Sequence, residues 1–209
     1  MSSKPAPEKK GLLIILSAPS GCGKTTLVDR LLKRHPEWLR SISATTRAPR
    51  PDEKDGSDYF FLSPQQFEQM EQKKEFLESA RIFNHAYGTP KAELTQHLAE
   101  GKNIVLAIDV QGMKQVKKLA DKNIALVTIF VLPPSIKVLR ERLEGRKTES
   151  PEEIQRRIEI AQDEIKAASL YDFTVVNQQL EQTVLEIEEV VKKIQNEKRR
   201  KPSSVLRTP

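Results

Sequence analysis

Residues 11–25 read Gly11-Leu-Leu-Ile-Ile-Leu-Ser-Ala-Pro-Ser-Gly-Cys-Gly-Lys-Thr25, and this stretch decides the fold class. The apolar run that ends at Ser17 predicts a fully buried strand of the kind found in parallel sheets. Residues 18–25 follow at once and match the P-loop pattern, except that Ala18 stands where the motif has its first glycine. Leucines then recur at helical spacing over residues 24–33. The motif therefore has the strand before it and the helix after it that its chemistry requires.

A P-loop binds phosphate groups through its backbone. Gly21 and Gly23 allow successive N–H groups to point at phosphate oxygens, and the N-terminus of the following helix adds a favourable dipole. Lys24 places a positive charge on the β- and γ-phosphates, and the Thr25 hydroxyl can ligate Mg²⁺. A chance glycine-rich turn would lack this context. We expect the following residues to bind ATP: Ala18, Pro19, Ser20, Gly21, Cys22, Gly23, Lys24, Thr25 and Thr26.

Cys22 is the only cysteine of the chain. A single cysteine excludes an intrachain disulfide framework and a cysteine-cluster metal site, and it suits the reducing cytoplasm. Its position near a helix N-terminus and Lys24 is a setting that can lower the pKa of a thiol. We therefore formulate the hypothesis that alkylation of Cys22 blocks ATP binding. The alternative is a small residue that fills a variable position of the loop.

Further apolar runs alternate with helical patterns along the rest of the chain. They predict strands at 103–109, 124–132 and 173–176, and helices at 91–100, 112–120, 135–143, from 151 onwards and at 180–193. This alternation predicts parallel βαβ units and hence a three-layer α/β core. Residues 41–90 interrupt the rhythm with short aromatic and Pro/Gly-punctuated pieces. They predict an inserted subdomain of small antiparallel strands around one helix, Pro64–Gln72, which Ser63 could cap.

Asp109 ends the second predicted core strand. In a parallel sheet its carboxylate emerges at the same edge as the P-loop, where ligands bind. This predicts that Asp109 and Thr25 hold Mg²⁺, Asp109 either directly or through water. The alternative is an ordinary acid at a strand end that faces a loop.

The basic charge of the chain lies at its C-terminal end. The sequence has 35 Lys and Arg against 29 Asp and Glu, a net charge of +6, and residues 192–209 hold seven of the basic residues and one acid. Residues 1–191 are therefore neutral, with 28 residues of each sign. A nucleic-acid contact is one interpretation of the tail. We favour a solvated helix end, because no aromatic residue is interleaved with the basic ones. No apolar run approaches the length of a membrane span, so no membrane partner is expected.

A set of motifs along the chain resembles the guanylate kinase family. The motifs are Ser43-Ala-Thr-Thr-Arg-Ala-Pro-Arg50, Asp55-Gly-Ser-Asp-Tyr-Phe60, Glu75-Phe-Leu-Glu78, Tyr87-Gly-Thr89, Ile108-Asp-Val-Gln-Gly112 and Leu143-Glu-Gly-Arg146. They are colinear with the family pattern from about Gly11 to Lys193. The resemblance implies an α/β protein with a three-layer P-loop NTPase core around a parallel sheet, an inserted mixed α/β GMP-binding subdomain and a helical lid.

The resemblance also implies a division of the chain. A disordered segment, 1–10, precedes a guanylate kinase-like domain, 11–197. Within that domain we expect the core at 11–40, 91–140 and 171–197, the GMP-binding subdomain at 41–90 and the lid at 141–170. A basic flexible tail, 198–209, would follow.

The implied reaction is the in-line transfer of phosphate from ATP to GMP, and to dGMP, with Mg²⁺. The residues implied to bind GMP are Ser43, Arg47, Arg50, Tyr59, Glu78, Tyr87, Thr89 and Asp109. Those implied to act in catalysis are Lys24, Arg47, Arg142, Arg146 and Arg157, and Asn177 matches the residue of the family that contacts the adenine of ATP. The chain departs from the family at Ala107, where an acid is usual, and at Gln178, where an Asp commonly follows the Asn.

The chemistry of these residues supports the assignment. Two arginines three residues apart, Arg47 and Arg50, suit a bidentate clamp on a phosphate dianion. Guanine presents N1–H and N2–H₂ side by side, so one carboxylate such as Glu78 accepts both, whereas adenine leaves it unpaired. Two alternatives stay open: a non-catalytic interaction module of the same fold, and a kinase for another nucleoside monophosphate or a sugar phosphate. The sequence says nothing of the oligomeric state.

Overall fold

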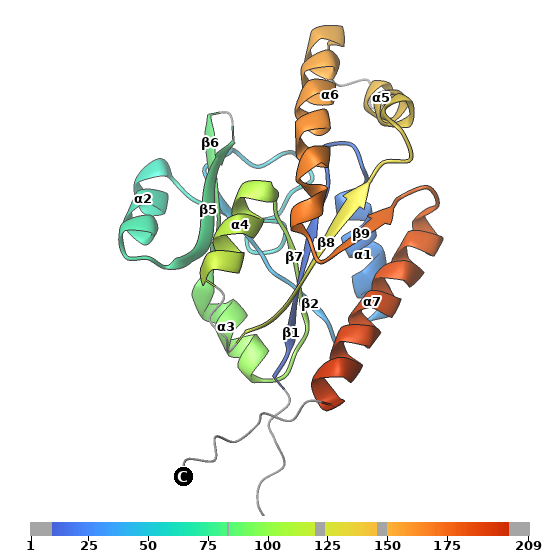
Figure 1. Cartoon of the computed structure of the whole chain (residues 1–209). Coiled ribbons are helices and arrows are strands. Elements are labelled where there is room, and N and C mark those ends of the chain that lie inside the picture. Colours follow the sequence, from blue (N-terminus) through green and yellow to red (C-terminus); the bar gives the residue numbers. More distant parts are fainter. Residues whose placement is uncertain (1–9, 83, 120–123, 146–149, 201–209) are drawn as a thin grey trace, which may run out of the picture.

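The computed structural model describes residues 10–82, 84–119, 124–145 and 150–200. It is an α/β protein with two sheets (Figure 1). In chain order the elements are β1 (Leu12–Ser17), α1 (Lys24–Arg34), β2 (Leu39–Arg40), β3 (Ala44–Thr45), β4 (Phe60–Phe61), α2 (Pro64–Gln72), β5 (Phe76–Ile82), β6 (His85–Pro90), α3 (Lys91–Ala99), β7 (Ile104–Ala107), α4 (Val110–Leu119), β8 (Ala125–Leu132), α5 (Ile136–Glu144), α6 (Pro151–Lys166), the short 3₁₀ helix η1 (Ala167–Leu170), β9 (Phe173–Val176) and α7 (Leu180–Arg200).

The larger sheet has five strands in the order β2-β7-β1-β8-β9, and every pair in it is parallel. β1 lies in the middle, between β7 and β8. The carboxyl ends of the strands therefore share one edge, from which the P-loop leaves β1 and the segment with Asp109 leaves β7. The predicted fold class, an α/β core around a parallel sheet, is confirmed.

The side chains of β1 divide the apolar core into two halves. Leu12, Ile14 and Leu16 pack on the side of α1 and α7, whereas Leu13 and Ile15 pack on the side of α3 and α4. Successive side chains of a strand point to opposite faces, so a strand that is apolar throughout must be covered on both. The continuous apolar run of the sequence is thus the direct cause of the helix–sheet–helix layering.

The smaller sheet has four strands in the order β4-β3-β6-β5 and carries α2. Its own small core contains Ala44, Phe67, Phe76 and Ala86. α2 begins with a capping box in which Ser63 and Gln66 satisfy each other's backbone N–H groups. The predicted cap at Ser63 is thus confirmed. Strand pairs β3–β6 and β5–β6 are antiparallel, as expected, but β3 pairs with β4 in parallel. The expectation of antiparallel pairing was wrong for that pair, because a long connection rather than a hairpin joins the two strands.

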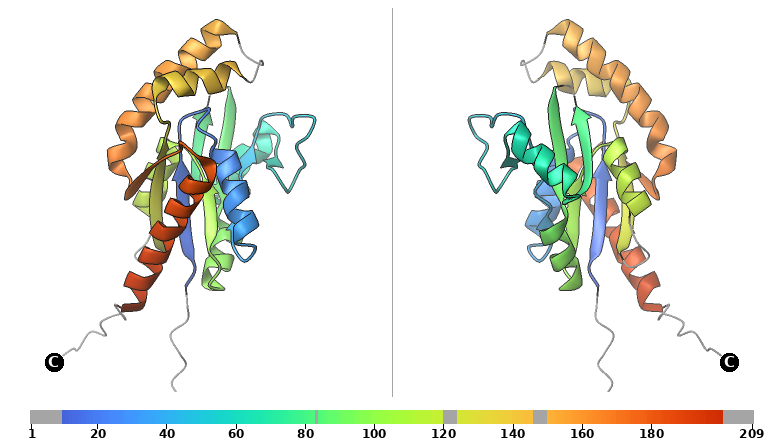
Figure 2. Two further views of the ribbon diagram at one scale, coloured as in Figure 1. Left: turned by 90° about the vertical axis from the view of Figure 1, so that its right-hand side faces the viewer. Right: turned by 90° about the vertical axis from the view of Figure 1, so that its left-hand side faces the viewer.

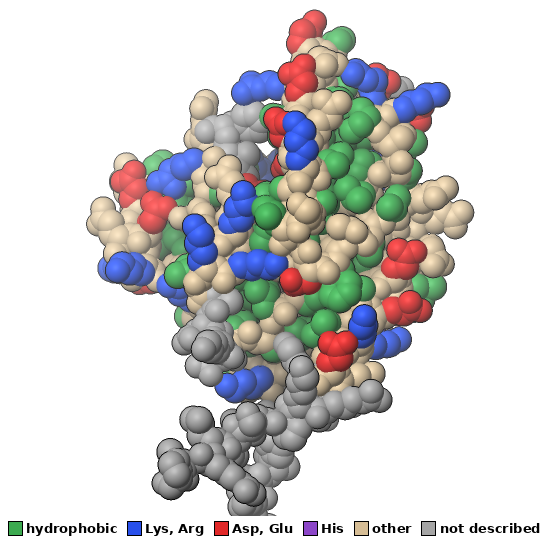
Figure 3. Space-filling model, viewed as in Figure 1, with side chains coloured by type: hydrophobic (Ala, Val, Ile, Leu, Met, Phe, Trp, Pro, Cys, Tyr) green, Lys and Arg blue, Asp and Glu red, His purple; other side chains and the backbone are tan. Residues whose placement is uncertain are grey.

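Helices α5 and α6 extend beyond the carboxyl edge of the larger sheet (Figures 1 and 2). The smaller sheet lies beside the same edge, on the side opposite to α5 and α6. The P-loop therefore lies between the smaller sheet and the pair α5 and α6, which we call the helical arm. The space-filling view shows a hollow in the surface between α6 and the side that carries β5 and β6 (Figure 3).

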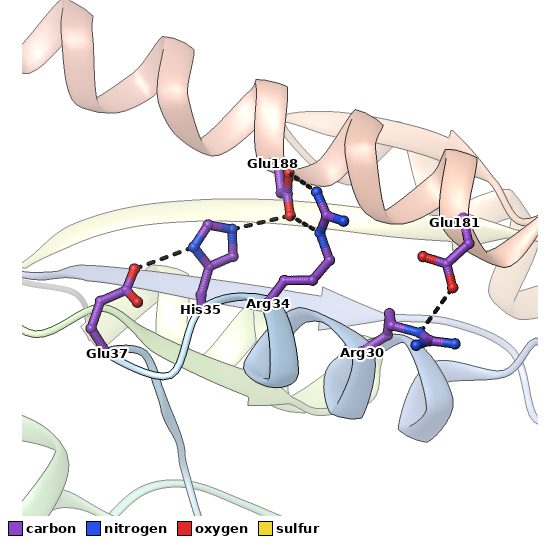
Figure 4. A network of polar contacts seen from close by, with 6 residues as sticks. All are labelled: Arg30, Arg34, His35, Glu37, Glu181 and Glu188. Carbon is purple, nitrogen blue, oxygen red and sulfur yellow. Dashed lines mark hydrogen bonds and ion pairs between the residues drawn. The ribbon is translucent and has the colours of Figure 1, made fainter.

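α7 closes the fold against α1 through a polar network (Figure 4). The buried carboxylate of Glu188 accepts hydrogen bonds from Arg34 Nε at 2.6 Å and Arg34 Nη2 at 3.2 Å, and it lies 3.1 Å from His35 Nε2. The His35 ring stacks on Trp38 with centroids 4.1 Å apart. One turn earlier in α1, Arg30 pairs with Glu181 of α7 at 2.9 Å.

The structure adds two features that the sequence pattern did not predict. β2 has only two residues, too few for any periodicity, yet it forms one edge of the larger sheet. α7 runs to Arg200 rather than 193, so it enters the segment expected as a flexible tail. Segment 1–9, residues 201–209 and Arg146 lie outside the described residues. None of the helices in the described ranges combines the length and the apolar character needed to span a bilayer.

Candidate active site

The P-loop connects β1 to α1 through two glycines in the left-handed region. Gly21 has φ 90° and Gly23 has φ 80°, conformations that L side chains rarely adopt. Among the non-glycine residues that the structure describes, positive φ occurs only at Lys74, so Ala18 replaces the usual first glycine without strain. Thr25 and Thr26 are exposed in the first turn of α1. The loop has the geometry that turns backbone N–H groups toward an anion.

Asn177 fixes the P-loop from outside. This buried residue follows β9, and its amide nitrogen donates to the carbonyl oxygen of Cys22 at 2.7 Å. Its amide oxygen accepts a hydrogen bond from the Thr183 hydroxyl at 3.3 Å. Both ends of the amide are thus engaged within the protein. The resemblance assigns Asn177 to the adenine of ATP, but in this structure its side chain supports the loop that would hold the phosphates.

Lys24 points along the carboxyl edge of the sheet toward β7. Its ammonium group donates to the carbonyl oxygen of Ile108 at 3.3 Å. Burial lowers the pKa of Lys24, and the negative charges of Asp109 and Glu164 act in the opposite direction. An ammonium group so placed is poorly hydrated, and an incoming phosphate would complete its environment.

Asp109 lies at the start of α4, where its Oδ1 accepts a hydrogen bond from the backbone N–H of Gly112 at 2.8 Å. The carboxylate of Asp109 and the hydroxyl of Thr25 are hard oxygen ligands of the type that Mg²⁺ prefers. Among the described residues no group of three or more Asp, Glu, His or Cys could hold a metal ion alone. The donor set nevertheless fits Mg²⁺, because this ion usually binds through one or two protein oxygens together with water and nucleotide phosphates.

Just after β3, the smaller sheet presents an arginine among aromatic rings. The guanidinium of Arg47 lies 5.5 Å from the centroid of the Tyr59 ring. Its Nη2 donates to both carboxylate oxygens of Glu53, at 2.8 and 2.9 Å. Tyr59 and Tyr87 meet edge to face with ring centroids 6.2 Å apart. Three of the four residues predicted to hold the acceptor phosphate are thus gathered in one place.

The fourth of these residues, Arg50, is exposed. Its backbone N–H donates to Glu53 Oε2 at 2.9 Å, so Glu53 joins the two arginine positions. Burial tends to raise the pKa of Glu53, but the hydrogen bonds from Arg50 and Arg47 outweigh it and hold this pKa below its usual value. Glu53 is a residue that the sequence reasoning missed.

Glu78 is a carboxylate almost without contact with solvent. It is 5% exposed, and its Oε1 accepts a hydrogen bond from the Thr89 hydroxyl at 2.6 Å. Burial raises the pKa of Glu78 to about 7, although Thr89 and the charge of Lys24 act in the opposite direction. The predicted pair Glu78 and Thr89 is therefore in direct contact, while Ser43 is half-buried and its carbonyl pairs with Phe60.

Arginines of the helical arm, formed by α5 and α6, contact the P-loop and the turn after β9. Arg157 of α6 donates from Nη1 to the Ser20 hydroxyl at 2.8 Å. Arg142 of α5 donates from Nη2 to the backbone carbonyl of Asn177 at 2.9 Å. Leu139 and Leu143 of α5 pack on the P-loop so closely that a Cβ at Gly21 would lie 3.0 Å or less from them. Arg146, the third predicted arginine of the arm, is outside the described residues.

The expectation that the setting of Cys22 lowers the pKa of its thiol is not met, and the hypothesis that alkylation blocks ATP binding stays a prediction. The side chain of Cys22 is fully buried, and burial raises the pKa of the thiol to about 12 despite the positive charges of Arg142 and Lys24. Cys22 is part of the apolar core beneath the loop. The structure supports the alternative, a small residue that fills space.

Together these residues form two clusters, one at the P-loop with Lys24 and Arg157 and one at Arg47 with Tyr59 and Tyr87. A sequence model of the guanylate kinase family matches residues 10–194. The chain belongs to the guanylate kinase family. As a member it is an enzyme, a nucleotide kinase, and this excludes the alternative of a non-catalytic module.

Individual members of the guanylate kinase family match nearly the whole chain. Guanylate kinase of Clostridioides difficile (strain 630) is 44% identical over 188 residues, which are 90% of this chain and 90% of that protein. Guanylate kinase of Paramagnetospirillum magneticum is 42% identical over 187 residues, covering 90% and 86%. The crystal structure of guanylate kinase from Anaplasma phagocytophilum matches with a TM-score of 0.73 at 30% identity, covering 90% of this chain and 87% of that one.

One further acid at the site of this kinase was not predicted from the sequence. Glu164 lies near the end of α6 and is half-buried. Burial raises its pKa, and the charge of Lys24 lowers it. No motif marks it, because acids recur along the exposed face of α6 and only the packing of the helix shows which one faces inward. Ala107, where the family has an acid, is the last residue of β7 and is exposed.

Proposed function

We propose that this protein transfers the γ-phosphate of ATP to GMP, and to dGMP, giving ADP and the corresponding diphosphate in the presence of Mg²⁺. The observation that carries the proposal is the buried pair of Glu78 and Thr89, which faces the same Lys24 that follows the P-loop glycines. A carboxylate so deeply buried needs donors, and guanine supplies two adjacent ones. The cytoplasm is the compartment we propose for this reaction.

The acceptor is recognised at both ends. Arg47, with Arg50 and the hydroxyls of Tyr59 and Tyr87, binds the phosphate of GMP through charge-assisted hydrogen bonds. Glu78 accepts from N1–H and N2–H₂ of guanine, for which it must be ionised. Binding of guanine therefore lowers the pKa of Glu78 from its value of about 7. Adenine offers no such pair of donors and would leave this buried carboxylate with only its hydrogen bond from Thr89, and for that reason AMP is rejected.

In the transfer step an oxygen of the GMP phosphate attacks the γ-phosphorus of ATP. The new P–O bond forms as the bond from the γ-phosphorus to the β,γ-bridging oxygen breaks, and the electron pair of that bond stays on ADP. Lys24, whose ammonium group contacts the segment after β7, stabilises the charge that develops on the β- and γ-phosphate oxygens. Arg142, Arg146 and Arg157 add positive charge from the helical arm.

Water must be kept from the γ-phosphate, since hydrolysis would otherwise compete with transfer. α5 already packs on Gly21 of the P-loop, and Arg157 already contacts Ser20. These contacts support a role of residues 141–170 as the lid. When bound by Thr25 and Asp109, Mg²⁺ would neutralise phosphate charge and orient the triphosphate.

A panel of acceptors tests the proposal. Coupled assays with ATP, Mg²⁺ and each of GMP, dGMP, AMP, CMP and UMP should give turnover with GMP and dGMP only. Lys24→Ala should abolish transfer to every acceptor, because the P-loop charge is lost. Glu78→Ala should mainly raise the KM for GMP. Turnover of another monophosphate above that of GMP would show a different acceptor, and turnover near background with all of them would overturn the proposal.

A further inference from the structure

β5 forms one edge of the smaller sheet, and α4 of the core packs beside it. The side-chain amide of Gln115, on α4, meets this edge at Ser79. Its Oε1 accepts from the backbone N–H of Ser79 at 3.1 Å, and its Nε2 donates to the carbonyl oxygen of Ser79 at 2.7 Å. One amide thus satisfies both backbone groups of a residue, as a neighbouring strand would. The contact joins the smaller sheet to the core.

The residue before Ser79 is Glu78, and the same helix also touches its side chain. A Cβ at Gly112 would lie 2.7 Å from Glu78 Oε2, so only glycine leaves room for the carboxylate there. Asp109, Gly112 and Gln115 are spaced three residues apart and therefore lie along one side of α4. This side links the candidate Mg²⁺ ligand Asp109 to the carboxylate proposed to read guanine.

The register of β5 changes just before Glu78. Pairing with β6 shifts between Phe76 and Glu78, where the strand has a bulge or an equivalent irregularity. Such a bulge re-aims the following side chain and locally interrupts the ladder of backbone hydrogen bonds. On the N-terminal side of Glu78, regular strand pairing therefore does not fix the orientation of its side chain. The clamp by Gln115 on the next residue supplies a constraint from outside the sheet.

We propose that Gln115 is a positioning residue for guanine recognition, which aims Glu78 by fixing Ser79 to α4. The inference rests on the proposed function, since it concerns how the acceptor base is read. Gln115 touches neither nucleotide in this assignment. It acts through the backbone of β5, and it holds the base-reading carboxylate in a fixed relation to Asp109 and Lys24.

The test is the variant Gln115→Met, which keeps the volume and length of the side chain and removes both hydrogen bonds. We expect the KM for GMP to rise about tenfold while kcat and the KM for ATP change by less than about twofold. Selectivity, measured as kcat/KM for GMP over inosine monophosphate, should fall about tenfold, because inosine lacks the N2 amino group. The control Gln96→Met removes an exposed amide on α3, bonded only to Glu100 in the described structure, and should leave all constants unchanged.

A second variant separates positioning from a general loss of structure. In the Glu78→Gln background, Gln115→Met should change the selectivity for GMP over inosine monophosphate by less than about twofold, because the residue through which it acts is already altered. Equal effects of Gln115→Met in both backgrounds would overturn the inference. So would a wild-type KM for GMP and wild-type selectivity in the single variant.

Protein that fails to fold is recognised by the loss of its cooperative thermal transition, and Gln115→Glu then takes the place of the methionine variant. It keeps the acceptor for the Ser79 N–H but sets a carboxylate against the Ser79 carbonyl, so the same loss of selectivity is expected. The wild-type enzyme measured alongside distinguishes a failure of the proposed function from a failure of the role of Gln115. Failure of wild-type protein to use GMP would refute the proposed function, whereas an unaltered variant refutes the role of Gln115 alone.

Discussion

At the scale of single residues, Glu78 links function to stability through its proton. The carboxyl has a pKa of about 7 in the folded protein against an ordinary value of 4.5. The folded state therefore binds more protons than the unfolded state between these values, and the free energy of unfolding falls as pH rises through this window. The loss is on the order of 3 kcal/mol and is complete above about pH 7.

Without nucleotide, Glu78→Gln should be more stable than wild type at pH 8 and similar to it at pH 4.5, because a neutral amide does not have to lose a proton. Denaturant unfolding of both proteins at several pH values measures the difference. A constant difference across the pH range would mean that the carboxyl is not the buried acid described here.

Glu53 is a second residue whose charge should matter for function. Its carboxylate holds the guanidinium of Arg47 and the backbone N–H of Arg50. Glu53→Gln should raise the KM for GMP about tenfold, because Arg47 loses its charged partner and its fixed direction. Selectivity between GMP and inosine monophosphate should not change, since both carry the same phosphate. Steady-state kinetics decide this, and a lower KM would show that Glu53 competes with the phosphate instead.

Cys22 shows why residue properties were harder to predict than residue roles. The local sequence, a helix N-terminus with Lys24 beside it, favours a thiolate, yet the core around Cys22 is assembled from residues far along the chain, such as Leu143. Burial destabilises the thiolate more than the positive charges of Arg142 and Lys24 stabilise it, so the pKa of the thiol rises. Glu164 and Gln115 escaped prediction for the same reason, because only tertiary packing distinguishes them from their neighbours.

At the scale of elements, the sequence predicted strongly those parts whose pattern is local. β1, the P-loop and α1 follow from one apolar run, two glycines and a leucine stripe, and Pro64 and Pro151 with the serines before them mark the starts of α2 and α6. β2 and the parallel β3–β4 pair have two residues per strand, so their pairing is set by tertiary contacts and not by periodicity.

The turn after β9 gives a prediction at this scale, because it supports the P-loop through Asn177. Asn177→Ala removes the hydrogen bond to the Cys22 carbonyl and should raise the KM for ATP and for GTP as donors by the same factor, about tenfold. If Asn177 instead reads adenine, only the KM for ATP rises and the preference over GTP is lost. Gln178→Ala, an exposed neighbour, serves as the control. Kinetics with the two donors distinguish these outcomes.

At the scale of the whole molecule, the last helix is joined to the first. Glu188 of α7 is 5% exposed and is contacted three times by Arg34 and His35 at the end of α1 (Figure 4). Glu181, on the same helix, is 58% exposed and makes one ion pair, with Arg30. Arg34 holds the pKa of Glu188 below its usual value, since its hydrogen bonds favour the carboxylate. The junction therefore stabilises the fold above the ordinary pKa of a glutamate and is lost as the pH falls through the lowered one.

These two glutamates allow a matched comparison. Glu188→Gln should lower the free energy of unfolding by about 2 kcal/mol at pH 7, because Arg34 and His35 lose a buried charged acceptor. For a chain of this size that corresponds to roughly 4–8 °C in Tm. Glu181→Gln should cost less than about 0.5 kcal/mol, as is usual for an exposed pair.

The kcat of both variants at 25 °C should equal that of wild type, since both residues lie at the junction of α7 with α1 and neither is a predicted site residue. Thermal unfolding at pH 7, paired with kinetics at 25 °C, measures both effects. Equal shifts in Tm for the two variants would show that burial does not set the strength of this junction. A loss of kcat in Glu188→Gln alone would mean that the junction acts through α1 on the P-loop, which then depends on the closing helix for its function as well as its stability.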